Sequence, residues 1–378
     1  MIKIGITGQP GFVGTHLYNY LGLQEDVERI PFKDEYFHDE TLLNNFVESC
    51  DVIVHLAAMN RHGDPQVIYD TNIKLVNQLV TACETTKSTP HILFSSSTQE
   101  DRDNLYGKSK LDGRKLLEEW AIRNNAKFTG FIIPNVFGPF GNPYYNSFIA
   151  TFCHQLTHGE QPEIQTDGDV KLIYVGELVE EIYEHIVAMQ HEEKEIAIID
   201  EVSVDHTSEN KVSSILNLLN SYKENYFKKG IIPNLDNTFE KNLFNTFLCY
   251  IDHKKYFPFP LTKHVDDRGS FVEVVKLNSG GQVSFSTTVP GITRGNHFHT
   301  RKAERFAVIK GKAKIELRKI GSDEVLSFEL DGNKPSFVDM PIWYTHNITN
   351  IGNEELYTIF WINEHYNPED GDTYFEKV

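Results

Sequence analysis

A glycine-rich turn near the beginning of the sequence constrains the fold more than any other feature. Residues 3–7 have the apolar pattern of a strand, and the segment 7–14 reads TGQPGFVG before a helical pattern begins. Gly8 permits a tight turn, Gly11 allows the backbone to approach a pyrophosphate, and Gly14 allows close helix–strand packing. Free amide groups at the start of the helix would then face the phosphates. The sequence therefore predicts a dinucleotide site.

The succession of strand and helix continues to about residue 200. Further strand candidates are 52–56, 91–95, 128–133 and 195–199, and helical candidates are 13–23, 71–85 and 109–124. This repetition indicates an α/β domain with a parallel sheet wound on both faces. We expect the domain to span residues 1–252.

The pattern of apolar and polar residues changes at YFPFPL, residues 256–261, where two prolines indicate an extended segment that connects two domains. Beyond it, short alternating apolar runs are separated by glycine and asparagine, which is typical of an all-β barrel or sandwich. We expect this second domain to span residues 258–378.

Composition narrows the class of protein. The 378 residues carry a net charge of −18, which gives no affinity for nucleic-acid phosphates or anionic membranes, so neither partner is expected. Four scattered cysteines form no CxxC pair, as in a reducing compartment. A strand pattern begins at once without a signal peptide, and no apolar run reaches the ~20 residues of a membrane span. We therefore expect a cytoplasmic protein.

Tyr106 and Lys110 are four residues apart, so they face the same side of a helix. In such a pair the lysine ammonium is expected to lower the tyrosine pKa and to hold a nicotinamide ribose. The phenol can then exchange a proton with a carbonyl or alcohol oxygen. Upstream, the serine run 95–97 follows a strand candidate, where a hydroxyl can polarise the same oxygen. The combination predicts hydride-transfer chemistry.

The choice between NAD and NADP depends on the segment after the second strand, which reads RIPFKDE at 29–35. A basic residue there accommodates a 2′-phosphate, whereas an acid binds the ribose hydroxyls. Because Lys33 precedes the two acids, we favour NADPH, with a solvated loop charge as the alternative.

Two segments resemble the metal motifs of cupins, GITRGNHFH at 291–299 and PIWYTH at 341–346, where Trp343 replaces the usual glycine. Side chains alternate along a strand, so His297 and His299 share a face. The candidate ligands are His297, His299, Glu304 and His346. Three imidazoles and one carboxylate suit zinc, although iron, nickel and manganese are also possible. A barrel that keeps polar core residues without metal is the alternative.

The first domain as a whole resembles an extended short-chain dehydrogenase/reductase, a Rossmann-type group that contains nucleotide-sugar epimerases, dehydratases and reductases. The shared segments are the glycine turn, HLAA at 55–58, Asn72, the serine run, the Tyr106/Lys110 pair and PNVFGP at 134–139. The resemblance implies that Ser97 is the hydroxyl partner of the tyrosine, with Ser96 as the second choice. It implies that Asn135 and Asn146 contact the substrate. The implied cofactor contacts are Gly8, Gly11, Phe12, Val13, Gly14, Lys33, Leu56, Ala57, Ala58, Asn72, Ser95, Lys110 and Pro134.

Two features depart from that group. Only eight residues separate Ser97 from Tyr106, fewer than usual, and the arginine common before the Pro–Asn pair is absent from FII at 131–133. We expect these differences to leave the substrate side more open.

The order of the two domains and four further segments resemble one narrow family over essentially the whole chain. The segments are YNSFIATFC at 145–153, DDRGSF at 266–271, PGITRGNH at 290–297 and DTYF at 372–375. The family is that of the CapF-type bifunctional capsular-polysaccharide enzymes, which are homodimers. The resemblance implies that the cupin epimerises carbon 3 of a UDP-linked 4-keto-2-acetamido-2,6-dideoxyhexose. The dehydrogenase then reduces the carbon 4 ketone with NADPH, giving UDP-6-deoxy-N-acetyl-L-talosamine for capsule or O-antigen synthesis.

Several points stay open at this level. Candidates for the epimerising base are Lys314, Glu316 and Tyr344. The alternatives to a bifunctional enzyme are a 4-ketosugar reductase whose cupin only binds sugar or dimerises, a reductase for a deoxythymidine-linked sugar, and a cofactor-sensing regulator built on an inactive dehydrogenase. The intact Tyr106/Lys110 pair argues against the regulator.

Overall fold

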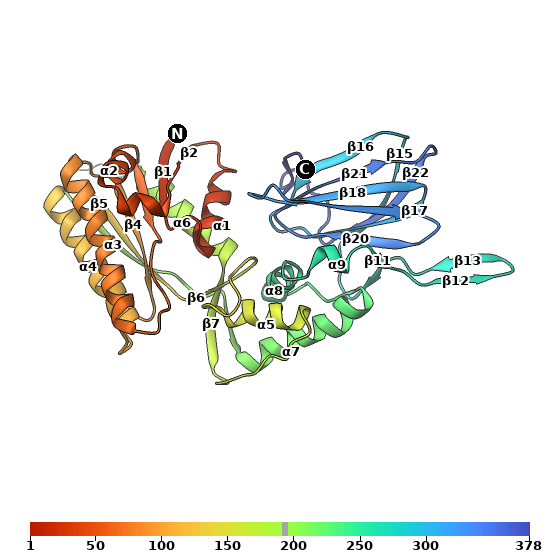
Figure 1. The fold of residues 1–378 in the computed structure, drawn as a ribbon, viewed down its shortest axis with the longest axis horizontal. Coiled ribbons are helices and arrows are strands. Elements are labelled where there is room, and N and C mark those ends of the chain that lie inside the picture. Colours follow the sequence, from red (N-terminus) through yellow and green to blue (C-terminus); the bar gives the residue numbers. More distant parts are fainter. Residues whose placement is uncertain (191–195) are drawn as a thin grey trace. The chain divides into compact units, whose positions relative to one another are not determined.

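The computed structural model describes residues 1–190 and 196–378, which divide into two compact units. Figure 1 shows that parallel strands flanked by helices dominate the first unit and antiparallel strands dominate the second. The first unit comprises the described residues of Met1–Phe137, Gly141–Ser147 and Asp169–Asn210. The second unit comprises Gly138–Phe140, Phe148–Gly168 and Lys211–Val378.

The first unit contains the predicted doubly wound parallel sheet, with strand order β2-β1-β3-β4-β5-β8. Its strands are β1 (Ile2–Thr7), β2 (Val27–Ile30), β3 (Val52–His55), β4 (His91–Ser97), β5 (Lys127–Ile133) and β8 (Ile198–Ser203). Its helices are α1 (Phe12–Leu21), α2 (Glu40–Glu48), α3 (Pro65–Thr86), α4 (Leu105–Asn124) and α6 (Val175–Gln190). Helices α2, α3 and α4 pack on one another, α1 packs on α6, and the two groups cover opposite faces (Figure 1).

Side-chain caps explain why two helices are longer than the apolar pattern predicted. Helix α3 begins at Pro65, where the Asp64 side chain accepts a hydrogen bond from Gln66 N at 2.9 Å. Helix α4 begins at Leu105, where Asn104 Oδ1 accepts from Gly107 N at 2.8 Å. Capping satisfies amides that the first turn leaves unbonded, so the helix extends beyond its apolar stripe. Strand β8 lies a few residues beyond the predicted 195–199, of which residue 195 is outside the described residues.

The second unit is built on two antiparallel five-stranded sheets, with orders β11-β20-β17-β22-β15 and β19-β18-β21-β16-β23. This arrangement confirms the predicted all-β barrel. The strands of the first sheet are β11 (Phe259–Pro260), β20 (Ser336–Met340), β17 (Glu304–Lys310), β22 (Leu356–Ile362) and β15 (Gln282–Thr288). Those of the second are β19 (Val325–Asp331), β18 (Lys312–Lys319), β21 (Tyr344–Asn350), β16 (Thr293–Phe298) and β23 (Tyr374–Phe375). A hairpin of β12 (Lys263–Asp266) and β13 (Gly269–Val272) forms a separate two-stranded sheet.

Helices that precede the predicted boundary lie in the same compact unit as the barrel. They are α5 (Phe148–Thr157), α7 (Val212–Tyr222), η2 (Lys223–Phe227), α8 (Thr238–Leu248) and α9 (His253–Tyr256). The division into domains at 1–252 and 258–378 therefore stays a prediction about which parts fold independently. None of the helices in the described part of the chain combines the length and the apolar character that a membrane span needs.

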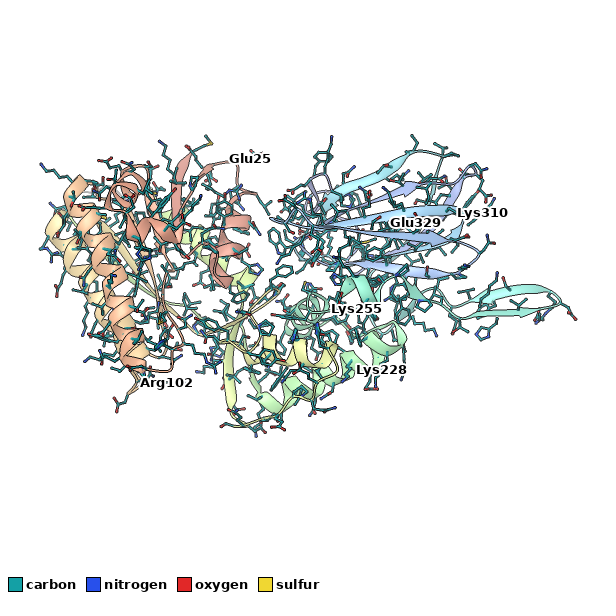
Figure 2. All side chains as sticks on the ribbon, viewed as in Figure 1. Glu25, Arg102, Lys228, Lys255, Lys310 and Glu329 are labelled. Atoms are coloured by element: carbon teal, nitrogen blue, oxygen red, sulfur yellow. The ribbon has the colours of Figure 1, made fainter. Side chains whose placement is uncertain are left out.

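Most charged side chains lie at the surface. Figure 2 shows Arg102, Lys228 and Lys310 pointing away from the ribbon, and all three are exposed. Lys110 and Arg305 are instead buried. Burying a charged side chain is costly unless the charge is paired. Buried lysine and arginine residues are therefore expected to have a specific structural or functional role.

Arg305 joins the barrel to the helices of the second unit. Its guanidinium donates to Asp339 Oδ1 and Oδ2 at 2.7 and 2.8 Å and to Gly230 O at 2.6 Å. Tyr226 Oη donates to the same carboxylate at 2.5 Å. Arg305 is 1% exposed and also covers the ring of Phe337 at 3.6 Å. Every group of this network is therefore paired.

Asp339→Ala should destabilise the second unit by about 3–5 kcal/mol, because it leaves the buried Arg305 charge without its counterion. Chemical denaturation followed by tryptophan fluorescence would measure this change, since Trp343 and Trp361 both lie in the barrel. Asp266→Ala is the control, because its ion pair with Arg268 is exposed and should contribute less than about 1 kcal/mol. Equal denaturation midpoints for the two variants would contradict this account.

Candidate active site and candidate metal centre

The glycine turn after β1 has the close approaches that its sequence predicts. Gly8 has φ +71°, and a Cβ there would lie 2.7 Å from Ala57 N, so the turns after β1 and β3 touch. A Cβ on Gly14 would lie 2.4 Å from Gly8 O. Gly11 is the N-cap residue of α1 and provides no side-chain hydrogen bond to the first turn. The first backbone amides of the helix, including those of Phe12 and Val13, can therefore bind an anion. The turn therefore fits a dinucleotide pyrophosphate.

Asn72 supports the neighbouring turn rather than pointing into open space. It is buried on α3, where Oδ1 accepts from Met59 N at 2.7 Å and Nδ2 donates to Met59 O at 3.1 Å and to Ser109 Oγ at 2.9 Å. These bonds fix the segment that directly follows β3, which contains Leu56, Ala57 and Ala58. Asn72 thus shapes the predicted adenosine side through the backbone.

Tyr106 and Lys110 lie one turn apart on α4, as predicted. Lys110 is buried, donates from Nζ to Ser95 O at 2.8 Å, and has Nζ 5.9 Å from the centre of the Tyr106 ring. Burial lowers the pKa of Lys110 to about 8, although Glu100 opposes the shift. The lysine is therefore held beside the phenol by the end of strand β4.

The expected depression of the Tyr106 pKa is wrong for the protein by itself. Burial raises the pKa of Tyr106 to about 12, and the charge of Tyr145 adds to the rise. The larger cause is desolvation, which disfavours the charged phenolate. The phenol is thus protonated near neutral pH, which is the state required of a proton donor.

The side chains of the three serines at the end of β4 lie on two opposite faces of the sheet. Ser96 is buried and its hydroxyl donates to the Glu100 carboxylate. Ser95 Oγ donates to His55 O at 3.2 Å, and Ser97 Oγ accepts from Gln99 N at 3.2 Å. Because side chains alternate along a strand, Ser95 and Ser97 share the face opposite to Ser96. This geometry favours Ser97 over Ser96 as the hydroxyl partner of Tyr106.

Glu100 and Arg114 fix the shortened loop between Ser97 and Tyr106, and the sequence did not reveal them. Arg114 donates to Glu100 Oε1 and Oε2 at 3.1 and 2.8 Å and also pairs with Glu118 and Glu201. Only the Arg114–Glu118 spacing of four residues could have been noticed in the sequence. The loop is held against α4 by charge pairs.

Three of the remaining predicted contacts, Lys33, Pro134 and Asn135, follow the carboxyl ends of strands in the first unit, whereas Asn146 lies in a loop. Lys33 is exposed just beyond β2, Pro134 follows β5, and Asn135 opens the exposed edge of β6 (Asn135–Phe137) with Nδ2 3.4 Å from Lys171 O. Asn146 is exposed in the segment 141–147, whose Tyr144 and Tyr145 carbonyls accept from Arg61 at 2.6 and 3.0 Å. Ligands of doubly wound sheets bind at these strand ends.

The four predicted metal ligands converge in the second unit. One donor atom from each of His297, His299, Glu304 and His346 lies within 4.8 Å of the others. Glu304 Oε2 is 3.0 Å from His346 Nε2 and 3.3 Å from His299 Nε2. These three atoms are buried without a hydrogen-bond partner. Buried polar atoms rarely stay unsatisfied, so the cluster fits a divalent cation.

The electrostatics of the cluster suit metal binding. Burial alone would raise the pKa of Glu304, but the close imidazoles of His299 and His346 outweigh it and hold that pKa low. Burial, and then the charge of His346, lowers the pKa of His297 to about 4. A deprotonated carboxylate and a neutral imidazole are the forms that bind metal. Trp343, at the position of the usual glycine, adopts φ +61° and stacks on Phe298.

The three candidate bases are placed less favourably. Lys314 and Glu316 pair with each other at 2.9 Å and lie opposite Thr349 and Asn347, on the face of the sheet away from His346. Their proposed role as the base is therefore wrong. Tyr344 shares the face of His346 but is half-buried against His253, at 5.3 Å between ring centres, and this desolvation raises the pKa of Tyr344.

Comparison with known proteins finds one family match in the N-terminal part of the chain and another in the C-terminal part. Residues 4–198 match the NAD dependent epimerase/dehydratase family, and residues 264–374 match the polysaccharide biosynthesis C-terminal domain. The UDP-2-acetamido-2,6-beta-L-arabino-hexul-4-ose reductase of Pseudomonas aeruginosa is 30% identical over 99% of this chain and 98% of its own length. The spore coat polysaccharide biosynthesis protein SpsL of Bacillus subtilis is 29% identical over 30% of this chain and 81% of its own length.

A solved structure extends the likeness over the whole chain. The crystal structure of the capsular polysaccharide assembling protein CapF from Staphylococcus aureus is 36% identical, with a TM-score of 0.63 and 100% of both chains covered. The family model matches just over half of the chain, and two relatives at 30% and 36% identity cover essentially all of it. The chain therefore belongs to the NAD dependent epimerase/dehydratase family, as a CapF-type protein.

Proposed function

We propose that this protein is a bifunctional nucleotide-sugar enzyme with a reductase domain at 1–252 and a metal-binding cupin domain at 258–378. The cupin epimerises carbon 3 of a UDP-4-keto-2-acetamido-2,6-dideoxyhexose, and the reductase domain reduces the 4-ketone with NADPH. The product is UDP-6-deoxy-N-acetyl-L-talosamine, for capsule or O-antigen synthesis in the cytoplasm. The observation that carries the proposal is the half-buried Tyr106 one helical turn from the buried Lys110, which is fixed at the end of β4, in a chain related over its full length to a UDP-hexulose reductase.

The residues of the first unit supply the proton and the orientation for the reduction. Bound NADPH provides the hydride. Tyr106, which burial keeps protonated, donates its proton to the ketone oxygen as carbon 4 becomes an alcohol. Ser97 donates a hydrogen bond to the same oxygen and so polarises the ketone. Lys110, fixed by Ser95 O, holds the ribose so that the nicotinamide faces the sugar.

The second unit supplies the epimerising chemistry in this proposal. His297, His299, Glu304 and His346 would hold zinc or another divalent metal, which would stabilise the enolate of the ketosugar. A hydrogen on the carbon next to a ketone becomes acidic enough for removal once that enolate is stabilised. Return of a proton to the opposite face of carbon 3 then completes the epimerisation.

A homodimer is part of the same proposal. Strand β15 is the edge of its sheet and exposes Val283 and Phe285, while the β12–β13 hairpin exposes Val265 and Phe271. Unpaired strand edges and neighbouring apolar side chains are stabilised when a second chain covers them. These exposed residues make the barrel the expected interface.

The test is incubation of the protein with a UDP-4-keto-2-acetamido-2,6-dideoxyhexose and NADPH in deuterated water. We expect NADPH oxidation, one deuterium at carbon 3 and a hydrogen from NADPH at carbon 4, read by NMR of the product. Oxidation of NADPH without deuterium at carbon 3 would restrict the enzyme to reduction. An unconsumed ketone would overturn the proposal.

A further inference from the structure

The segment 370–378 crosses the strands that carry the candidate metal ligands. Strand β23 within it pairs with β16, and Phe375 lies opposite His297. Glu376 N donates to Asn296 O at 3.0 Å, and Glu376 O accepts from the hydroxyl of Thr345, the neighbour of His346. The segment therefore touches the backbone or side chains next to two of the ligands.

Asp372 is the central residue of this segment and is 6% exposed. Its Oδ1 accepts from Thr300 N at 3.0 Å and from Thr300 Oγ1 at 2.7 Å. Its Oδ2 accepts from Arg301 N and from Lys302 N, both at 3.1 Å. All four donors belong to the turn between His299 and Glu304, so one carboxylate fixes the stretch of chain that separates two ligands.

The backbone of Asp372 acts on a ligand directly. Its carbonyl oxygen accepts from His299 Nδ1 at 2.5 Å. A carbonyl can only accept, so the ring proton lies on Nδ1 and the lone pair of Nε2 is directed to the cluster. That Nε2 is buried without a hydrogen-bond partner and lies 3.3 Å from Glu304 Oε2. Asp372 thus selects the imidazole tautomer that binds metal.

We infer that Asp372 is a positioning residue of the metal centre, although it lies about seventy residues along the chain from the ligands it arranges. The carboxylate holds the turn so that His299 and Glu304 converge, and the carbonyl orients the imidazole. The inference rests on the proposed metal-binding role of the cluster. It adds to that role a residue that contacts no metal and that neither cupin motif contains.

Asp372→Asn is the sharpest test, because asparagine keeps the shape and tolerates the φ of +40° at this position. The new amide nitrogen would face the Arg301 and Lys302 N–H groups, so two hydrogen bonds would be replaced by a repulsive contact. We expect the zinc dissociation constant, measured by chelator competition, to rise roughly tenfold to a hundredfold. We also expect the visible absorption of the cobalt-loaded protein to change, because the ligand geometry changes.

Asp370→Asn is the matched control, since Asp370 is exposed and its carboxylate pairs only with Arg301 among the described residues. It should leave zinc affinity and the cobalt spectrum as in the parent protein. Thr300→Val removes one donor to Asp372 and should weaken zinc binding a few-fold, which keeps the inference testable if Asp372→Asn folds poorly.

The outcomes separate this inference from the proposed function. A parent protein that fails to bind zinc or another divalent metal would refute the metal-binding role itself. A parent that binds zinc tightly, with Asp372→Asn and Thr300→Val within twofold of it, would refute only the role of Asp372. NADPH binding to the first unit should be equal in all these proteins, while tryptophan fluorescence of Trp343 and Trp361 reports whether the second unit of each variant is folded.

Discussion

Replacing Tyr106 by phenylalanine is expected to lower kcat for ketone reduction roughly a hundredfold to ten-thousandfold, the usual contribution of a positioned proton donor. The half-buried phenol on α4 is protonated near neutral pH and is the proton donor that the variant lacks. The ring remains, so the packing against Lys110 is preserved. The measurement is the rate of NADPH oxidation with the UDP-4-ketosugar.

Two controls test whether the loss of ketone reduction is specific to the Tyr106 phenol. Tyr69→Phe removes a phenol that hydrogen-bonds Asp112 at 2.8 Å on the other side of α4, and it should reduce at the parent rate. Tyr106→Phe should bind NADPH with parent affinity and should still exchange carbon 3 with deuterated water, because neither property uses the phenol. Ketone consumption at the parent rate would remove Tyr106 from the mechanism.

Local sequence was sufficient for the parts of the site that depend on short spacing. The three glycines of the first turn and the four-residue separation of Tyr106 and Lys110 specify backbone geometry within one turn, so their chemistry could be predicted without a fold. The i, i+2 spacing of His297 and His299 was also sufficient to predict that both join one cluster, although β16 ends at Phe298 and His299 directly follows it. The parallel sheet wound on both faces was predicted from the repetition of strand and helix, but its strand order was not.

Long-range contacts account for what the sequence did not reveal. Asp372 meets the turn at 300–302 only because β23 returns to pair with β16, and no motif records that pairing. Arg114 meets Glu100 because the shortened loop folds back on α4. The raised pKa of Tyr106 has the same origin, since burial is a property of the packed fold and not of residue spacing.

Replacing His346 by alanine is expected to raise the zinc dissociation constant about a hundredfold to a thousandfold, because four ligands share on the order of 10–16 kcal/mol of binding energy. His346 is 1% exposed and its Nε2 lies 3.0 Å from Glu304 Oε2, so no solvent ligand replaces it without loss. Zinc content after dialysis and chelator competition would measure the change. His365→Gln, an exposed histidine in the same unit, should retain parent affinity.

The same variant decides what the barrel does. If the metal stabilises the enolate, His346→Ala should lose deuterium exchange at carbon 3, measured without NADPH so that reduction does not interfere. Tyr106→Phe should show the reverse pattern, with exchange retained and reduction lost. Opposite losses in two variants of one chain cannot arise from general unfolding, because each variant keeps the activity that the other lacks. Exchange that persists in His346→Ala would instead make the barrel an accessory to a reductase with a single activity.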